Sequence, residues 1–176
     1  MIEHQVQHDQ SSNRPVTAGY SEQPAPLGSY AGFLAAFGAG FLGFLAASRR
    51  LDRPLPERFS TQDVLLLGVA THKLTRIVTR DWVTSPLRAP FTSYEGSTGG
   101  GEVKERPRGR GFQRATGELL TCPWCFAPWT AAGLGYGLVL APRGTRFVAT
   151  LFAAVALSDY LQHGYNRVKQ LSTSGK

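Results

Sequence analysis

The sequence predicts an all-α fold, a small integral membrane bundle of three to four hydrophobic helices. Three observations predict it: an uncharged run at 30–47, a largely apolar segment at 62–80 and a pair of apolar segments within 126–157. The mean hydropathy of −0.16 resembles that of a soluble protein, because long polar tracts separate these apolar blocks. Apolar runs, rather than the average, determine whether a helix enters a bilayer.

The first transmembrane helix is expected at 29–48. Its uncharged stretch of about eighteen residues is near the lower limit for crossing a hydrocarbon core of roughly 30 Å, and the basic pair Arg49 and Arg50 follows it. Small residues recur at intervals of four, at Gly32, Ala36 and Gly40 and again at Ala39, Gly43 and Ala47. Such rows allow helices to approach closely in lipid, whereas glycine is costly in a soluble helix. We therefore favour a membrane helix over a buried helix of a soluble protein.

A second helix is expected at 62–80, with Ser60 or Thr61 as its N-cap and Asp63 in its first turn. Its first half is apolar, but its second half carries Lys73 and Arg76. At the bilayer centre each of these would cost about 2.5–3.5 kcal/mol. Two placements remain open: the helix spans and its basic side chains extend to the surface, or it lies at the interface.

The last apolar region is expected to form a transmembrane hairpin. Its arms are 126–141 and 147–157, with a turn at 142–144. Each arm is short, so tilt or local thinning of the bilayer is needed. The chain is thus divided into a disordered N-terminal tract at 1–28, the first helix at 29–48, a membrane domain at 62–165 with a flexible loop at 92–116, and a basic tail at 166–176.

Basic residues set the expected orientation. The formal net charge is +7, and lysine and arginine favour the cytoplasmic side of membrane proteins. With three spans, the 62–80 helix lies on the inner surface and the hairpin tip is outside. With four spans, the arginines of 49–58 are outside. Both arrangements place the large loop, the cysteines and the C-terminus in the cytoplasm.

The CPWC motif at Cys122 and Cys125 is the sharpest local feature. Thiols three residues apart share one side of a helical turn, and a helix N-terminus favours the thiolate. This spacing suits a redox pair, or half of a zinc site that His72 and His163, or a second copy, would complete. The surroundings lack a thioredoxin-like βαβ pattern and a second CxxC, so simple packing is the third interpretation. The sequence leaves all three open.

Two polar groups lie at the expected membrane boundary. Arg76, Asp81 and Glu118 form a candidate structural cluster, because ionisable side chains in this position usually pair. Asp159 and His163 stand one helical turn apart and form a candidate interfacial pair. A catalytic or proton-relay role is the alternative for each group, and the structural role is favoured.

Several of these residues also carry a resemblance. Leu74-Thr75-Arg76, Asp81, Pro86-Leu87-Arg88 and the stretch GELLTCPWC at 117–125 together resemble the DUF1360 family of bacterial membrane proteins, which includes a sporulation-associated protein. The resemblance covers about Asp63 to His163 and leaves out the first helix. It implies a location in the bacterial cytoplasmic membrane and no established activity.

The expected function follows from these features. No nucleotide loop, Ser-His-Asp set or paired-carboxylate site is recognisable, which favours a non-enzymatic protein, although enzymatic activity stays open. We expect a multi-pass structural or assembly component, without a cofactor, that acts through helix–helix packing and a basic cytoplasmic loop. Its expected partners are the lipid bilayer and further copies or another membrane protein, with no nucleic acid. The alternative is a thiol-dependent redox or metal-binding membrane protein that uses Cys122 and Cys125, with zinc as the candidate metal.

Overall fold

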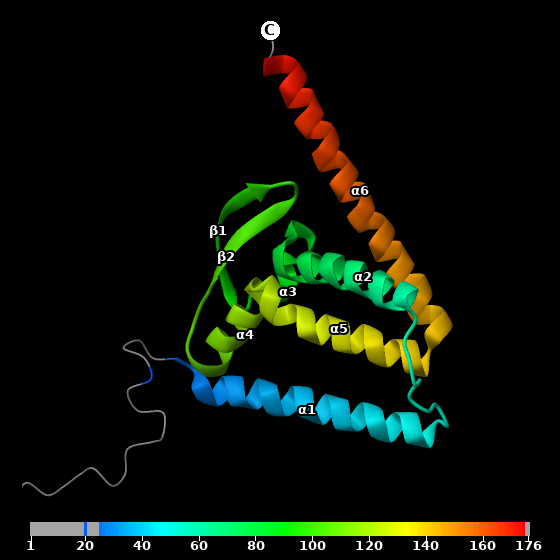
Figure 1. Ribbon diagram of the computed structural model, residues 1–176. Helices are drawn as coiled ribbons and strands as arrows, with labels where there is room; N and C mark the ends of the chain where they lie inside the picture. The colour runs from blue at the N-terminus through cyan, green and yellow to red at the C-terminus, as the bar shows by residue number, and fades with distance from the viewer. Residues whose placement is uncertain (1–19, 21–24, 175–176) are drawn as a thin grey trace, which may run out of the picture.

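The structure is a computed structural model that describes residue 20 and residues 25–174 (Figure 1). In chain order the elements of this part are α1 (Leu27–Arg50), α2 (Thr61–Arg80), the 3-10 turn η2 (Trp82–Thr84), α3 (Ser85–Arg88), β1 (Thr92–Gly99), β2 (Glu102–Pro107), α4 (Gly111–Thr121), α5 (Pro123–Leu140) and α6 (Pro142–Ser174). The expected disorder at 1–28 falls mainly outside the described residues, although Leu27 and Gly28 already belong to α1.

The all-α prediction is right for most of the described chain and wrong for one hairpin. The stretch expected as a flexible loop at 92–116 instead forms β1 and β2, which pair antiparallel, and the beginning of α4. Its glycines suggested flexibility, but they build the turn between the strands. Gly99, Gly100 and Gly101 have φ angles of +88°, +61° and +82°, which glycine adopts without the steric cost that other residues meet.

The hairpin is fastened to the helices beside it. Val103 of β2 is buried, and the Trp82 N–H donates to the Gly101 carbonyl at 2.9 Å. Helix α4 approaches so closely at Gly117 that a Cβ there would collide with the Phe91 carbonyl. The polar segment after α2 is therefore a folded unit with its own packing.

Contacts at two places fix which helix ends lie together. Ser60 caps α2, as predicted, by accepting the Asp63 N–H at 3.0 Å. The Asp63 carboxylate binds the Arg146 guanidinium in the first turns of α6 at 2.8 and 2.9 Å. Near the start of α1, Tyr30 donates a hydrogen bond to Glu118 at the end of α4. The starts of α2 and α6 thus share one end, and the starts of α1 and α5 share the other (Figure 1).

Helix α1 lies beside α5 and contacts the body through aromatic side chains (Figure 1). Phe37 meets Trp129 edge-on with ring centroids 5.2 Å apart, and Phe44 stacks on Tyr136 at 4.4 Å. Aromatic pairs at such distances add to the stabilisation from burial. One stripe of α1 therefore holds the helix in place.

The first small-residue row of α1, Gly32, Ala36 and Gly40, is not covered by the body. Ala36 and Gly40 are exposed, and a Cβ added at Gly32 or Gly40 would meet nothing within 4 Å. Among the residues that the structure describes, no helix packs closely on Gly32 or Gly40, so the contact that this row predicts is not made there.

Helix α6 is 33 residues long and outreaches the other helices. Its first half packs on α2, and its second half projects away from the body (Figure 1). The tail expected at 166–176 continues this helix to Ser174. The turn predicted at 142–144 is shorter than expected, because α5 ends at Leu140 and α6 already begins at Pro142.

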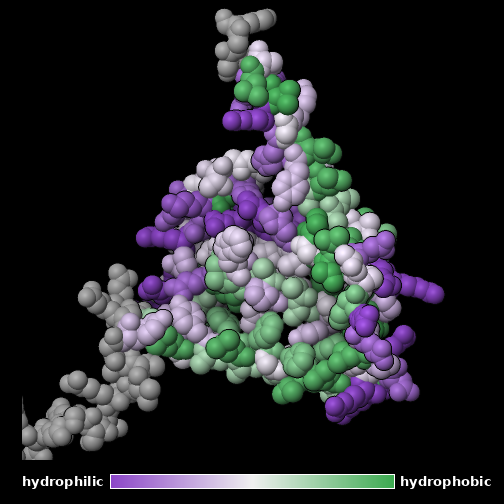
Figure 2. All heavy atoms as spheres, viewed as in Figure 1, coloured by the Kyte–Doolittle hydropathy of each residue, from purple (hydrophilic) through white to green (hydrophobic). Residues whose placement is uncertain are grey.

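Burial is partly inverted relative to a soluble domain, because few large apolar side chains are inside and a charged one is. Among the described residues, the largest fully buried side chains are Arg88 and Thr75, and four of the seven buried apolar residues are alanines. Large apolar side chains are exposed on several helices, among them Leu34, Leu42, Leu65, Phe147, Leu151 and Leu161. Figure 2 shows apolar surface along α1 and the outer side of α6, with hydrophilic residues gathered over the hairpin and the opposite end.

Among the described residues one helix, α1, is long and apolar enough to cross a membrane. This is weak evidence for membrane association, because core helices and signal sequences share these properties. Helix α5 has 18 residues and carries no charge, but it is not among the candidate spans. The predicted bundle of three to four membrane helices is thus supported by α1 alone on length and composition.

Candidate functional site

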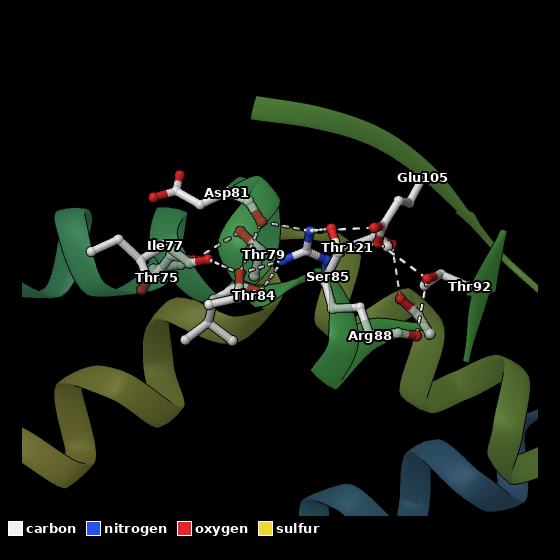
Figure 3. Close-up of polar contacts among 12 residues, drawn as sticks. Thr75, Ile77, Thr79, Asp81, Thr84, Ser85, Arg88, Thr92, Glu105 and Thr121 are labelled. Atoms are coloured by element: carbon white, nitrogen blue, oxygen red, sulfur yellow. Dashed lines mark hydrogen bonds and ion pairs between the residues drawn. The ribbon is translucent and has the colours of Figure 1, made fainter. Parts of the chain in front are cut away.

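Arg88 lies at the centre of a buried polar network that joins α2, η2, α3 and both strands (Figure 3). Its Nε and Nη2 donate to the Glu105 carboxylate at 2.8 and 3.3 Å. Its Nη atoms also reach the carbonyls of Val78 and Asp81 at 2.7 and 2.9 Å and the hydroxyls of Thr84 and Ser85 at 2.6 and 3.1 Å. Each guanidinium nitrogen therefore has at least one acceptor, as a buried cation requires.

Glu105 is the charged partner in this network, and 7% of its side chain is exposed. Thr92 donates a further hydrogen bond to its carboxylate at 3.1 Å. Burial raises the pKa of the Glu105 carboxyl, but the hydrogen bonds and positive charge of Arg88, with Thr92 and Ser85, outweigh burial and hold the pKa below its ordinary value. The pair is therefore charged at neutral pH and clamps the hairpin against the end of α2.

A polar pocket of about 570 Å³ lies between the second half of α2, the hairpin turn and the middle of α6. Its polar side chains are His72, Lys73, Arg76, Asp81, Glu102, Asp159, Tyr160, Gln162, His163 and Asn166, with Thr98 of β1. Lys73 pairs with Asp159 at 2.7 Å, and Arg76 Nε donates to Glu102 at 2.9 Å. Both cations thus have carboxylate partners, and the pairs join α2 to α6 and to the hairpin.

Cys122 and Cys125 form a disulfide at the junction of α4 and α5. Cys122 is the N-cap residue of α5, and its Sγ accepts the Cys125 N–H at 3.2 Å. Cys125 and Trp124 are exposed, whereas Cys122 is half-buried. Zinc binds thiolates, so this bond would have to be reduced first. In the part of the chain that the structure describes, no group of three or more candidate ligands gathers to hold a metal.

A family model described as a protein of unknown function, DUF1360, matches residues 66–165. The chain belongs to the DUF1360 family. The matched region begins in α2 and ends in α6, so it contains the Arg88 network, the polar pocket and the disulfide, and it leaves out α1. The resemblance inferred from the sequence motifs is confirmed.

Two Bacillus subtilis (strain 168) proteins are similar to this chain. Sporulation protein YjcA is 28% identical over 102 residues, which cover 56% of this chain and 86% of that protein. UPF0713 protein YngL is 28% identical over 90 residues, which cover 49% of this chain and 65% of that protein. No solved structure matches.

The DUF1360 residues expected to form one polar cluster are separated in the structure. Arg76 and Asp81 both line the polar pocket, where Arg76 binds Glu102. Glu118 lies elsewhere and binds Arg114 at 3.0 Å. The cause is the hairpin, which the sequence did not predict and which supplies Glu102 as the nearer carboxylate.

The expected pair on α6 is also arranged differently. Asp159 and His163 both line the polar pocket, as one helical turn allows. Asp159 binds Lys73 of α2 rather than His163. The pair thus belongs to a contact between two helices.

Sequence reasoning missed the Arg88–Glu105 pair as a site. A signal was present, since Pro86-Leu87-Arg88 is among the motif pieces that resemble DUF1360. Its partner Glu105 stands in a stretch whose glycines and charges suggested a loop. Without the hairpin, nothing in the sequence joins the two residues.

Proposed function

We propose that this DUF1360 protein is an integral membrane protein that acts as a non-enzymatic assembly component, with apolar helices in the bilayer and the hairpin at its surface. The observation that carries the proposal is the inverted burial: Arg88 is inside, while large apolar side chains of α1, α2 and α6 are outside. In water each exposed apolar Å² forgoes about 25 cal/mol. Lipid removes that penalty, because hydrocarbon solvates leucine and phenylalanine.

The helix-end contacts support four spans over three. With three spans, Asp63 is on the inner surface and Arg146 is outside, separated by a hydrocarbon core of roughly 30 Å. In the structure their side chains are 2.8 Å apart. We therefore propose that α1, α2, α5 and the first half of α6 cross the membrane.

The distribution of basic residues supports a cytoplasmic hairpin. Residues 80–118 contain seven lysines and arginines, and α6 adds Arg167 and Lys169. The end of α1 and the α1–α2 linker together contain four, and the first turns of α6 contain two, Arg143 and Arg146. By the preference of basic residues for the cytoplasmic side, the hairpin, the disulfide and the end of α6 face the cytoplasm.

Assembly would use the exposed small-residue face of α1. This face is defined by Gly32, Ala36 and Gly40, and in lipid such a row lets a second helix approach closely. The test is disulfide crosslinking in native membranes with Cys122→Ser/Cys125→Ser as background. Ala36→Cys should yield a crosslinked dimer, whereas Phe33→Cys, whose ring faces Phe112, should not. A strictly monomeric Ala36→Cys protein would contradict assembly through α1.

The name of the relative YjcA suggests the process. We propose that the assembly belongs to spore formation, on the basis of 28% identity to that sporulation protein. The test is spore yield of a Bacillus subtilis strain that lacks YjcA. This chain should raise the yield more than its Arg88→Met variant does.

A second candidate function is thiol-dependent redox chemistry. One observation favours it: Cys122 and Cys125 are paired, and Cys125 is exposed beside an exposed tryptophan. The test is differential alkylation in cells before and after a reducing pulse. Reversible interconversion of dithiol and disulfide supports the function, and a bond that stays oxidised throughout contradicts it.

A further inference from the structure

We propose that the Cys122–Cys125 disulfide exchanges with a protein dithiol, that the incoming thiolate attacks Cys125, and that Cys122 is the leaving group. This inference rests on the second candidate function. It takes from the membrane proposal only the cytoplasmic location of the disulfide and does not depend on assembly through α1. The two cysteines differ in exposure and in hydrogen bonding, so each has a different role in the exchange.

Access favours attack at Cys125. A thiolate must reach the sulfur along the direction of the S–S bond, so the exposed cysteine is the target. Cys125 is exposed in the first turn of α5, whereas Cys122 is half-buried at the junction with α4. Trp124 beside it is 89% exposed.

The helix favours departure of Cys122. Cys122 is the N-cap of the 18-residue helix α5, and its Sγ already accepts the Cys125 N–H at 3.2 Å. The partial positive charge at the N-terminus of a helix stabilises a thiolate there and lowers the thiol pKa. A thiol with a lower pKa leaves faster in exchange. Both effects direct the reaction the same way.

The exchange proceeds in two steps. The partner thiolate forms a bond to Cys125 Sγ while the S–S bond breaks and its electron pair goes to Cys122 as thiolate. The second thiolate of the partner then attacks the partner's own first sulfur and releases Cys125. The partner dithiol loses two electrons and becomes a disulfide, and the two cysteines are reduced and take up two protons.

The exposed indole favours a protein as the partner. Trp124 offers an apolar surface directly beside Cys125, and aromatic side chains supply much of the contact energy in protein interfaces. A small thiol needs no such surface. On the cytoplasmic side that we propose for the hairpin, disulfides are as a rule transient and catalytic or redox-sensing.

The test uses purified full-length protein in detergent micelles, with reduced glutathione as the first probe. After a short reaction the thiols are blocked with N-ethylmaleimide, and fragment mass spectra locate the glutathione. We expect the adduct on Cys125 and the maleimide on Cys122, in an excess of roughly tenfold. The same protein unfolded in denaturant is the control and should give nearly equal adducts.

Two outcomes separate this inference from the function on which it rests. Glutathione mainly on Cys122 of the folded protein would overturn the assignment and leave the redox function intact. A folded protein that forms no adduct at either cysteine would overturn both.

Reduced thioredoxin as the second probe tests the class of partner. Trp124→Ala should slow reduction by thioredoxin several-fold and leave reduction by glutathione unchanged, whereas Trp82→Ala, which removes another exposed tryptophan, should change neither. Equal rates with thioredoxin for Trp124→Ala and the unaltered protein would overturn the protein-docking role of Trp124.

Discussion

Arg88 and Glu105 place two charges inside the protein, and hydrogen-bond donors and acceptors of neighbouring residues surround them. The guanidinium bonds to a carboxylate, two carbonyls and two hydroxyls. Such a pair contributes little net stability compared with apolar residues, but removing one member leaves the other buried and uncompensated. Its effect here is to fix the place of the hairpin relative to α2.

Arg88→Met should destabilise the protein by about 3–5 kcal/mol, because Glu105 would remain buried without its partner. Arg106→Met is the matched control, since the Arg106 side chain is 72% exposed and contacts Glu95 only at 3.7 Å. It should change stability by less than about 0.5 kcal/mol. Denaturant unfolding in micelles measures both, and equal free energies of unfolding for the two variants would refute the role of Arg88.

Acid should weaken the same pair. The pKa of Glu105 is lowered on folding from the ordinary value of 4.5. Its charge therefore stabilises the fold above the unfolded pKa, and this contribution is lost as the pH falls through the lower, folded pKa. Thermal unfolding between pH 7 and pH 3 should show a steeper loss for the unaltered protein than for Glu105→Gln. Parallel curves would show that Glu105 does not contribute.

At the scale of single elements, α1 has two faces with different tasks. Its aromatic stripe binds the body, with Phe44 stacked on Tyr136. Its small residues stay exposed and lie outside the DUF1360 match, which begins in α2. The helix thus lies outside the family match and, in the function that we propose, supplies a separate surface for helix contacts.

Phe44→Ala should loosen α1 from the body. Phe44 is 8% exposed, and truncation of a buried phenylalanine costs about 3–5 kcal/mol. Leu42→Ala is the control, because Leu42 is 66% exposed on another side of the same helix. Hydrogen exchange should rise along α1 in the first variant and stay unchanged in the second. Unchanged exchange in both would mean that the aromatic seam does not hold the helix.

The apolar helices α1, α2 and α5 could be predicted from local chemistry, whereas α3, α4 and the hairpin were not predicted. Uncharged runs and the Ser60 cap specify α1, α2 and α5 because these signals lie within each helix. The strands depend on a distant contact, the Arg88–Glu105 pair, and on glycines whose positive φ angles resemble flexibility in a sequence. A local sequence pattern predicts neither the distant contact nor the φ angles of the glycines.

The partners of the pocket residues could not be predicted either, because they also depend on distant contacts. The sequence identified Arg76, Asp81, Asp159 and His163 as boundary residues, and all four line one pocket. Their partners came from elements of unknown position: Glu102 from the hairpin and Lys73 from a neighbouring helix. Residue type indicated that the groups pair, but only the fold determines with which partner.

At the scale of the whole molecule, apolar surface lies between two polar ends (Figure 2). One end holds the α1–α2 linker and the α5–α6 turn, joined by Asp63 and Arg146. The other holds the hairpin, joined to α2 through Arg88 and Arg76. In a membrane these ends would lie on opposite surfaces.

Cysteine accessibility measures this arrangement directly. Leu55→Cys, Gly100→Cys and Gly144→Cys are introduced one at a time into Cys122→Ser/Cys125→Ser protein and exposed to an impermeant maleimide on intact cells and on inverted vesicles. The four-span account predicts that positions 55 and 144 react from outside the cell and position 100 only from the cytoplasmic side. Labelling of 55 together with 100 and apart from 144, or of all three from one side, would contradict it.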